Sequence, residues 1–134
     1  MEWRRGLRVL LDTHALLWAT LSPAALSREA AAIIADESNV VLVSAASAWE
    51  VATKVRLGKL PGAAELEKDF LDVMDDAGYT LLPIQAECGL RAGRLISEHR
   101  DPFDRMIAAQ SLAEDIPVLS ADSKLDMLGV RRIW

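Results

Sequence analysis

Short apolar runs alternate along this chain with longer stretches in which apolar and polar residues repeat at helical spacing. The clearest runs, at residues 8–11 and 40–43, are rich in Val and Leu and too short for helices, which is typical of buried strands. Further strands are predicted at residues 79–82, 118–120 and 131–133. Helices are predicted at residues 13–20, 27–36, 66–77, 85–97, 102–115 and 123–128, and one more begins near Ser44 or Ser47 and ends at Gly58. Because strands and helices alternate, we expect an α/β fold with a parallel sheet covered on both faces.

Four acidic residues lie where this pattern would bring them to one spot: Asp12, Glu50, Asp104 and Asp122. Asp12 and Asp122 follow predicted strands, and α/β proteins bind ligands at the carboxyl ends of parallel strands. Two carboxylates about 4 Å apart repel by roughly 4 kcal/mol at an effective dielectric of 20, so such a cluster requires a compensating cation. Oxygen ligands without a His or Cys cluster indicate Mg²⁺ or Mn²⁺ rather than zinc.

Two of these acids can equally be helix caps. Asp12 and Asp122 each stand immediately before a predicted helix, and Asp is a preferred N-cap residue. Thr13 offers a hydroxyl that could bond a ligand or cap the helix, and Ser120 is a candidate supporting hydroxyl.

The other two acids also have structural explanations. Lys54 follows Glu50 by four residues, which permits a surface ion pair, although Lys54 could instead lie at the edge of the site and meet phosphate. Asp101 precedes Pro102 and is interpreted as the N-cap of the next helix, hence as structural. Asp104 would then lie in the first turn, where the helix dipole favours a carboxylate, and we interpret it as a rigidly held ligand.

Other catalytic patterns do not occur in the sequence. His14 and His99 have no nitrogen or sulfur partner at metal-ligand spacing, and Ser44 and Ser47 lack a nucleophile elbow. The glycines are dispersed, so no phosphate-binding loop is predicted.

Two other classes of α/β protein compete with this interpretation, and the sequence lacks a residue that each of them requires. A receiver-like signalling module also gathers carboxylates and magnesium, but the second strand is followed by Ser-Ala-Ala and not by an acceptor Asp. A phosphatase with an Asp nucleophile would need a second Asp two residues after Asp12, where His14 stands.

Composition indicates the number of domains and the cellular compartment, and says less about the chemistry. The chain of 134 residues has a net charge of −5 and one cysteine, Cys88, so we expect one soluble domain over residues 1–134 in a reducing cytoplasm. Arg4, Arg5 and the apolar residues after them resemble an export signal, but Asp12 interrupts the apolar stretch. No run approaches the roughly 20 apolar residues of a membrane span.

Four segments, in order, resemble the motifs of the PIN-domain family, in particular its VapC-type toxin group. They are Leu10-Leu11-Asp12-Thr13-His14-Ala15-Leu16-Leu17-Trp18, Ser44-Ala45-Ala46-Ser47-Ala48-Trp49-Glu50 with Lys54 and Gly58-Lys59-Leu60 after it, His99-Arg100-Asp101-Pro102-Phe103-Asp104-Arg105 through Gln110, and Leu119-Ser120-Ala121-Asp122. The similarity continues to Val130-Arg131-Arg132-Ile133-Trp134 and so runs nearly end to end.

This resemblance implies a three-layer α/β/α sandwich with a central parallel sheet, a divalent-metal-dependent endoribonuclease activity and neutralisation by a cognate antitoxin. By motif position, Asp12, Glu50, Asp104 and Asp122 would be the catalytic acids and would hold one or two Mg²⁺ or Mn²⁺ ions that activate water. A homodimer is also expected, while a PIN-type nuclease without a toxin role remains an alternative. Basic residues that could line the RNA path are Lys54, Arg56, Lys59, Arg100 and Arg105, each of which could equally be an ordinary surface cation.

Overall fold

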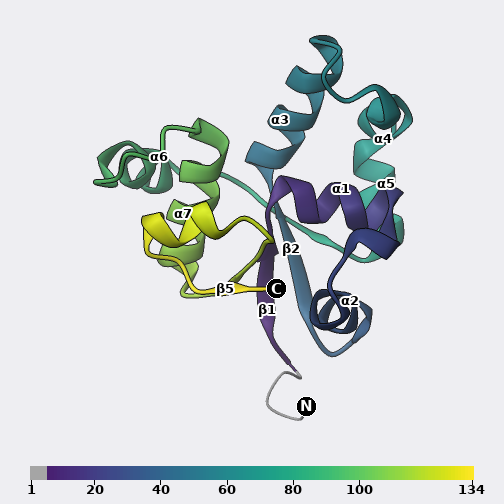
Figure 1. The fold of residues 1–134 in the computed structure, drawn as a ribbon, viewed down its shortest axis with the longest axis horizontal. Helices are drawn as coiled ribbons and strands as arrows, with labels where there is room; N and C mark the ends of the chain where they lie inside the picture. The colour runs from purple at the N-terminus through teal and green to yellow at the C-terminus, as the bar shows by residue number, and fades with distance from the viewer. Residues whose placement is uncertain (1–5) are drawn as a thin grey trace.

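The protein, described here from a computed structural model of residues 6–134, is built around one five-stranded parallel sheet (Figure 1). The strand order is β3-β2-β1-β4-β5, and every neighbouring pair is parallel. The strands are β1 (Arg8–Leu11), β2 (Val40–Ser44), β3 (Thr80–Leu82), β4 (Val118–Leu119) and β5 (Arg132–Ile133). Arg4 and Arg5, which belong to the stretch that resembles an export signal, lie outside the described residues.

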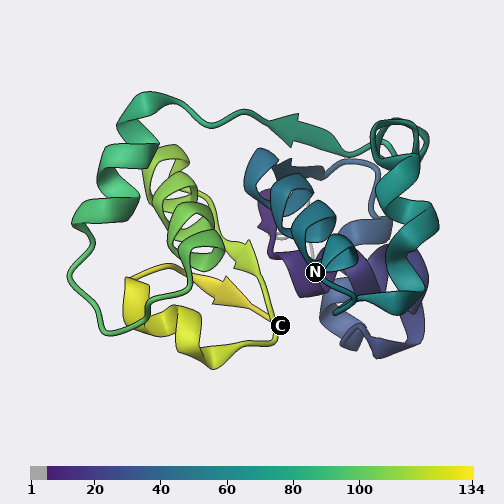
Figure 2. The ribbon, with the colours of Figure 1, turned by 90° about the horizontal axis from the view of Figure 1, so that it is seen from above.

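Helices cover both faces of the sheet, as predicted (Figure 2). They are α1 (Thr13–Leu21), α2 (Arg28–Ala35), α3 (Ala45–Arg56), α4 (Ala64–Lys68), α5 (Phe70–Ala77), α6 (Ala86–Arg94) and α7 (Pro102–Glu114), with 3₁₀ turns η2 (Pro23–Ala25), η3 (Pro61–Ala63) and η4 (Ser123–Leu128). Among the described residues, no helix is long and apolar enough to span a bilayer.

The two cores follow from the alternation of side chains along the central strands. Val9 and Leu11 of β1 pack with buried residues of α1, α2, α4 and α5, whereas Leu10 between them packs against α7 and η4. All three side chains are fully buried, because β1 is the middle strand and has a helical layer on each side. This accounts for the continuous apolar run that predicted the strand.

One predicted helix, at residues 66–77, is wrong in detail. The segment forms two helices, α4 and α5, which meet at Asp69, where the backbone leaves the helical region with φ −107° and ψ 25°. The apolar residues Leu66 and Phe70 on the two sides of the break are both buried in the same core. Because both side chains face the same core, the apolar residues keep their helical spacing across the break, and the periodicity of the sequence could not reveal the break.

The segment before α7 also differs from prediction. The helix predicted at residues 85–97 ends at Arg94, and residues 95–101 form a connection instead. Arg105 holds this connection from α7: its guanidinium donates to the carbonyls of Ala92, His99 and Leu95. The extra length of non-helical chain brings His99 back toward the first turn of α7.

Candidate metal centre

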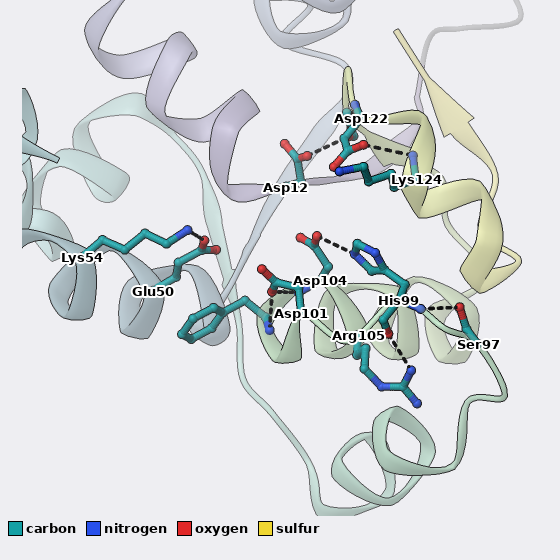
Figure 3. Close-up of polar contacts among 12 residues, drawn as sticks. Asp12, Glu50, Lys54, Ser97, His99, Asp101, Asp104, Arg105, Asp122 and Lys124 are labelled. Carbon is teal, nitrogen blue, oxygen red and sulfur yellow. Dashed lines mark hydrogen bonds and ion pairs between the residues drawn. The ribbon is translucent and has the colours of Figure 1, made fainter. Parts of the chain in front are cut away.

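The four predicted acids come from four different elements at the carboxyl end of the sheet (Figure 3). Asp12 stands between β1 and α1, Glu50 lies in the second turn of α3, Asp104 is in the first turn of α7, and Asp122 precedes η4. Figure 3 shows the carboxylates of Asp12, Glu50 and Asp104 around one common space, with Asp122 beyond Asp12 toward Lys124.

Asp12 is the most firmly held of the four. Its side chain is 3% exposed, and Oδ1 accepts a hydrogen bond of 2.8 Å from the backbone N–H of Ala15, so the residue is the N-cap of α1. The Ser120 hydroxyl donates to Oδ2 and itself accepts from the backbone N–H of Asp122 at 3.0 Å. Capping and a role at the site are therefore compatible, because each carboxylate oxygen retains a second lone pair.

Thr13 neither caps α1 nor faces an acid. Its hydroxyl shares a 2.9 Å hydrogen bond with that of Ser47 in α3, and both side chains are buried. This bond links α1, which Asp12 caps, to α3, which carries Glu50.

Glu50 is buried and only half satisfied. Its side chain is 5% exposed, so the ion pair that the spacing to Lys54 permitted does form, but with a buried carboxylate rather than at the surface. Lys54 does donate to Oε2, but Oε1 is buried and has no hydrogen-bond partner among the described residues. A buried polar atom without a partner costs about 1–3 kcal/mol, and more when it is charged.

Asp104 has a partner that the sequence did not indicate. Its Oδ2 lies 2.8 Å from Nε2 of His99, which precedes the helix start at Pro102, and no recognisable spacing in the sequence signals this contact. Asp101 is the N-cap of α7, as predicted, and its Oδ1 accepts from the backbone N–H groups of Phe103 and Asp104 at 2.9 and 3.0 Å.

Asp122 is placed differently from the other three acids. It caps η4 by accepting a 2.9 Å hydrogen bond from the backbone N–H of Lys124, and it is half-buried rather than buried. Asp12, Glu50 and Asp104 thus face one space, whereas Asp122 lies beyond Asp12 and is connected to it through Ser120.

Burial raises the pKa of the Asp12 and Asp104 carboxyls above their ordinary values. The hydrogen bonds from Ser120 and His99 lower these two pKa values, but desolvation has the larger effect. The charge of Asp104 raises the pKa of Asp12 further, and those of Asp101 and, to a smaller extent, Glu50 raise the pKa of Asp104. The Asp104 carboxylate therefore repels those of Asp12 and Glu50, and a bound cation would relieve that repulsion.

The donor set fits a hard divalent cation. Asp12, Glu50 and Asp104 all offer carboxylate oxygen, and the unpartnered Glu50 Oε1 is a buried acceptor that a cation would satisfy. The spacing is not that of a preformed cage, because within residues 6–134 no three His, Cys, Asp or Glu side chains form a ready metal-binding group. The Lys54 ammonium donates to Glu50 Oε2, an oxygen that could otherwise bind a cation.

A parallel α/β sheet with acids at its carboxyl edge defines a class of ligand-binding α/β protein. Within this class, the PIN-domain profile matches residues 9–130, and the chain belongs to the PIN-domain family. Membership of the PIN-domain family argues against the receiver-like and phosphatase alternatives.

Individual relatives agree with this assignment. The chain is 61% identical over 33 residues to "Ribonuclease VapC16" of Mycobacterium tuberculosis (strain ATCC 25618 / H37Rv), a match that covers 25% of this chain and only 23% of that protein. The fold of the present chain is similar to that of a chain in the crystal structure of VapBC2 from Rickettsia felis, which was solved bound to a DNA fragment from the VapBC2 promoter. The TM-score is 0.69, with 15% identity over 95% of this chain and 98% of that one. FitAcB from Neisseria gonorrhoeae gives a TM-score of 0.63 and 19% identity over 94% of this chain and 96% of that one. The three-layer α/β/α fold predicted from the resemblance is confirmed.

Proposed function

We propose that the protein is a divalent-metal-dependent endoribonuclease and the toxin of a toxin–antitoxin pair. The observation that carries the proposal is the buried, unpartnered Glu50 oxygen, which shares one space with the raised-pKa carboxylates of Asp12 and Asp104. PIN-domain nucleases generally use divalent metal ions, and a match to a protein named as a ribonuclease supports RNA as the substrate.

Asp12, Glu50 and Asp104, with Asp122 at the rim, would hold one or two Mg²⁺ or Mn²⁺ ions. When bound, such an ion supplies Lewis acidity toward water and toward the attacked phosphate. Ser120 and Ala15 fix the orientation of Asp12, and the cap at Asp101 fixes the helix turn that carries Asp104.

Lys54 has two tasks in this proposal. Without metal it neutralises Glu50, and its position four residues along α3 places it at the site's edge, where it can meet the phosphate backbone of RNA. Hydrolysis would leave a 3′-hydroxyl and a 5′-phosphate, because no side-chain base or ribose-activating group is evident in the sequence.

The partners are part of the proposal. The resemblance to VapC-type toxins and the shared fold with VapBC2 support a cognate antitoxin. A homodimer, a cytoplasmic location and a single functional domain over residues 1–134 are proposed on the same basis.

A direct test is to incubate the purified protein with RNA in Mn²⁺, in Mg²⁺ and in chelator, and to map the new ends. We expect cleavage only with metal, with 5′-phosphate products. Asp104→Asn should abolish it, and Asp101→Asn is the matched control on the same helix turn. Metal-independent cleavage, or cleavage that survives Asp104→Asn, would refute the proposed mechanism.

A further inference from the structure

An apolar pocket of about 220 Å³ lies between α3, α6 and α7 and has no role in the metal centre. Two aromatic side chains form part of its lining, Trp49 from α3 and Phe103 from α7. Their rings meet edge to face, with centroids 4.8 Å apart and planes at 75°. Ile84, Pro102 and Met106 add further apolar surface.

The pocket adjoins the acids through the covalent chain. Trp49 immediately precedes Glu50, and Phe103 immediately precedes Asp104, so each aromatic residue is the neighbour of a candidate ligand. The rings and the two acids are therefore carried by the same turns of α3 and α7. Trp49 is nonetheless 62% exposed, although Trp side chains are highly buried on average.

Arg105 gives the pocket a positive charge. It belongs to the lining, and its guanidinium donates to backbone carbonyls at residues 92, 95 and 99. None of the ion pairs found within residues 6–134 includes it. The pocket therefore combines aromatic faces with a cation, which suits the flat ring of a nucleotide.

Size restricts the occupant further. A pocket of about 220 Å³ is smaller than the roughly 300–1,000 Å³ of sites that enclose drug-sized ligands, so it admits a single ring system. Apart from the Arg105 guanidinium, whose donors are engaged by carbonyls, its lining is almost entirely apolar, and it offers little for reading base identity by hydrogen bonds.

We propose that this pocket holds one nucleobase of the RNA substrate, at a nucleotide adjacent to the bond that is cut. The inference rests on the proposed ribonuclease function and adds a binding subsite to it. Stacking on Trp49 and Phe103 places the scissile phosphate at the carboxylates, and it selects for an unpaired base rather than for a particular one.

The test begins with a randomised RNA pool, cleaved by the wild-type protein in Mn²⁺ and sequenced at the new ends. A short oligonucleotide that contains the resulting cut is then made with a single abasic ribose at each position near the cut. The ratio kcat/KM is measured for the wild type, Trp49→Ala, Trp49→Leu, Trp49→Phe and, as a remote exposed control on α5, Leu71→Ala.

Base stacking lost by alanine substitution should lower kcat/KM about 5- to 150-fold in Trp49→Ala. Trp49→Leu, which keeps an apolar side chain and decides the matter if the alanine variant does not fold, should lose as much. Trp49→Phe should retain most of the activity, and Leu71→Ala all of it. For the wild type, an abasic ribose at one position should lower kcat/KM by a similar factor. The same abasic ribose should lower the kcat/KM of Trp49→Ala little further, because the substitution and the missing base remove the same contact.

The remaining outcomes separate failure of the proposed ribonuclease function from failure of the base pocket. If the wild type does not cleave the pool, the proposed function fails and the base pocket fails with it. If the wild type cleaves and Trp49→Ala cleaves equally well, or the abasic and Trp49 losses multiply at every position, only the base pocket is refuted. Normal cleavage by Trp49→Ala combined with loss of inhibition by a co-expressed antitoxin would assign the pocket to a protein partner.

Discussion

Individual side chains at the sheet edge perform two tasks at once. Asp12 caps α1 and offers a carboxylate to the site, and Asp122 caps η4 at its rim. Capping fixes the carboxylate through a backbone N–H, so a ligand held this way loses little side-chain entropy when it binds a cation. Glu50, by contrast, depends on Lys54 alone and keeps one oxygen unpartnered.

Removing the charge of a site acid should remove most activity. We expect Asp12→Asn, Glu50→Gln, Asp104→Asn and Asp122→Asn each to reduce RNA cleavage by more than the ~10–100-fold typical of losing a ligand's supporting partner, because amides are weaker ligands of hard cations. Asp101→Asn should cost far less, since Asn caps as well as Asp. Cleavage rates in Mn²⁺, with circular dichroism to confirm folding, provide the measurement; an equal loss in Asp101→Asn would contradict this division of roles.

The raised pKa of the Asp12 carboxyl makes the metal-free protein sensitive to pH. Because the folded pKa exceeds the unfolded one, the folded state binds more protons between the two values, and its stability falls as pH rises. Asp12→Asn removes that penalty, so metal-free Asp12→Asn should melt above the metal-free wild type near neutral pH. The gap should close as pH falls toward about 4, the ordinary value of an Asp carboxyl. Thermal melts in chelator across this range test the sign, and a gap that widens on acidification would count against buried charge at Asp12.

At the scale of elements, the α6–α7 connection is arranged from one side chain. The Arg105 guanidinium satisfies carbonyls at residues 92, 95 and 99, and the same connection carries His99 to Asp104. A planar guanidinium can bridge several acceptors at fixed angles, which an ammonium cannot. The connection therefore carries His99 to the candidate metal centre, and Arg105, which holds the connection, also lines the apolar pocket.

Arg105→Lys should loosen this connection while the sheet persists. Each charged hydrogen bond contributes about 1.5–3 kcal/mol, and lysine can replace only part of the set. We expect a lower melting temperature and faster hydrogen exchange or proteolysis within residues 95–101. Arg94→Lys, on the neighbouring helix α6, is the matched control and should change neither. Unaltered protection of residues 95–101 in Arg105→Lys would show that other contacts hold the connection.

For the whole molecule, the proposed metal binding would be linked to folding through the sheet edge. The acids come from α1, α3, α7 and the turn before η4, so they are near one another only when the parallel sheet is assembled. A cation that binds the native state alone must then stabilise the entire fold.

Saturating Mn²⁺ should therefore raise the melting temperature. At 100 times the dissociation constant the linkage is about 2.7 kcal/mol, and at roughly 3–6 °C per kcal/mol for a chain of this size the rise is about 8–16 °C. Asp12→Asn should shrink the rise. Calorimetry or fluorescence melts with and without chelator provide the measurement, and a melting temperature unmoved by millimolar Mn²⁺ or Mg²⁺ in the folded protein would argue against a metal centre.

The sequence by itself determined the strands and most helix boundaries, because these depend on local signals. Apolar runs marked β1 and β2, Ser27 and Asp101 marked helix starts, and Gly78 marked the end of α5 with a φ of 76°. Such signals arise within a few residues, from side-chain alternation, capping and backbone freedom.

The tertiary structure alone decided what these residues touch. The break between α4 and α5, the contact of His99 with Asp104, the link from Thr13 to Ser47 and the arrangement of Arg105 all join residues through packing or through chain reversals. The burial of Glu50 belongs to the same group, since its spacing to Lys54 is identical on an exposed and on a buried helix face. Spacing along a chain fixes which residues can meet within one element, whereas contacts between elements depend on how the layers assemble.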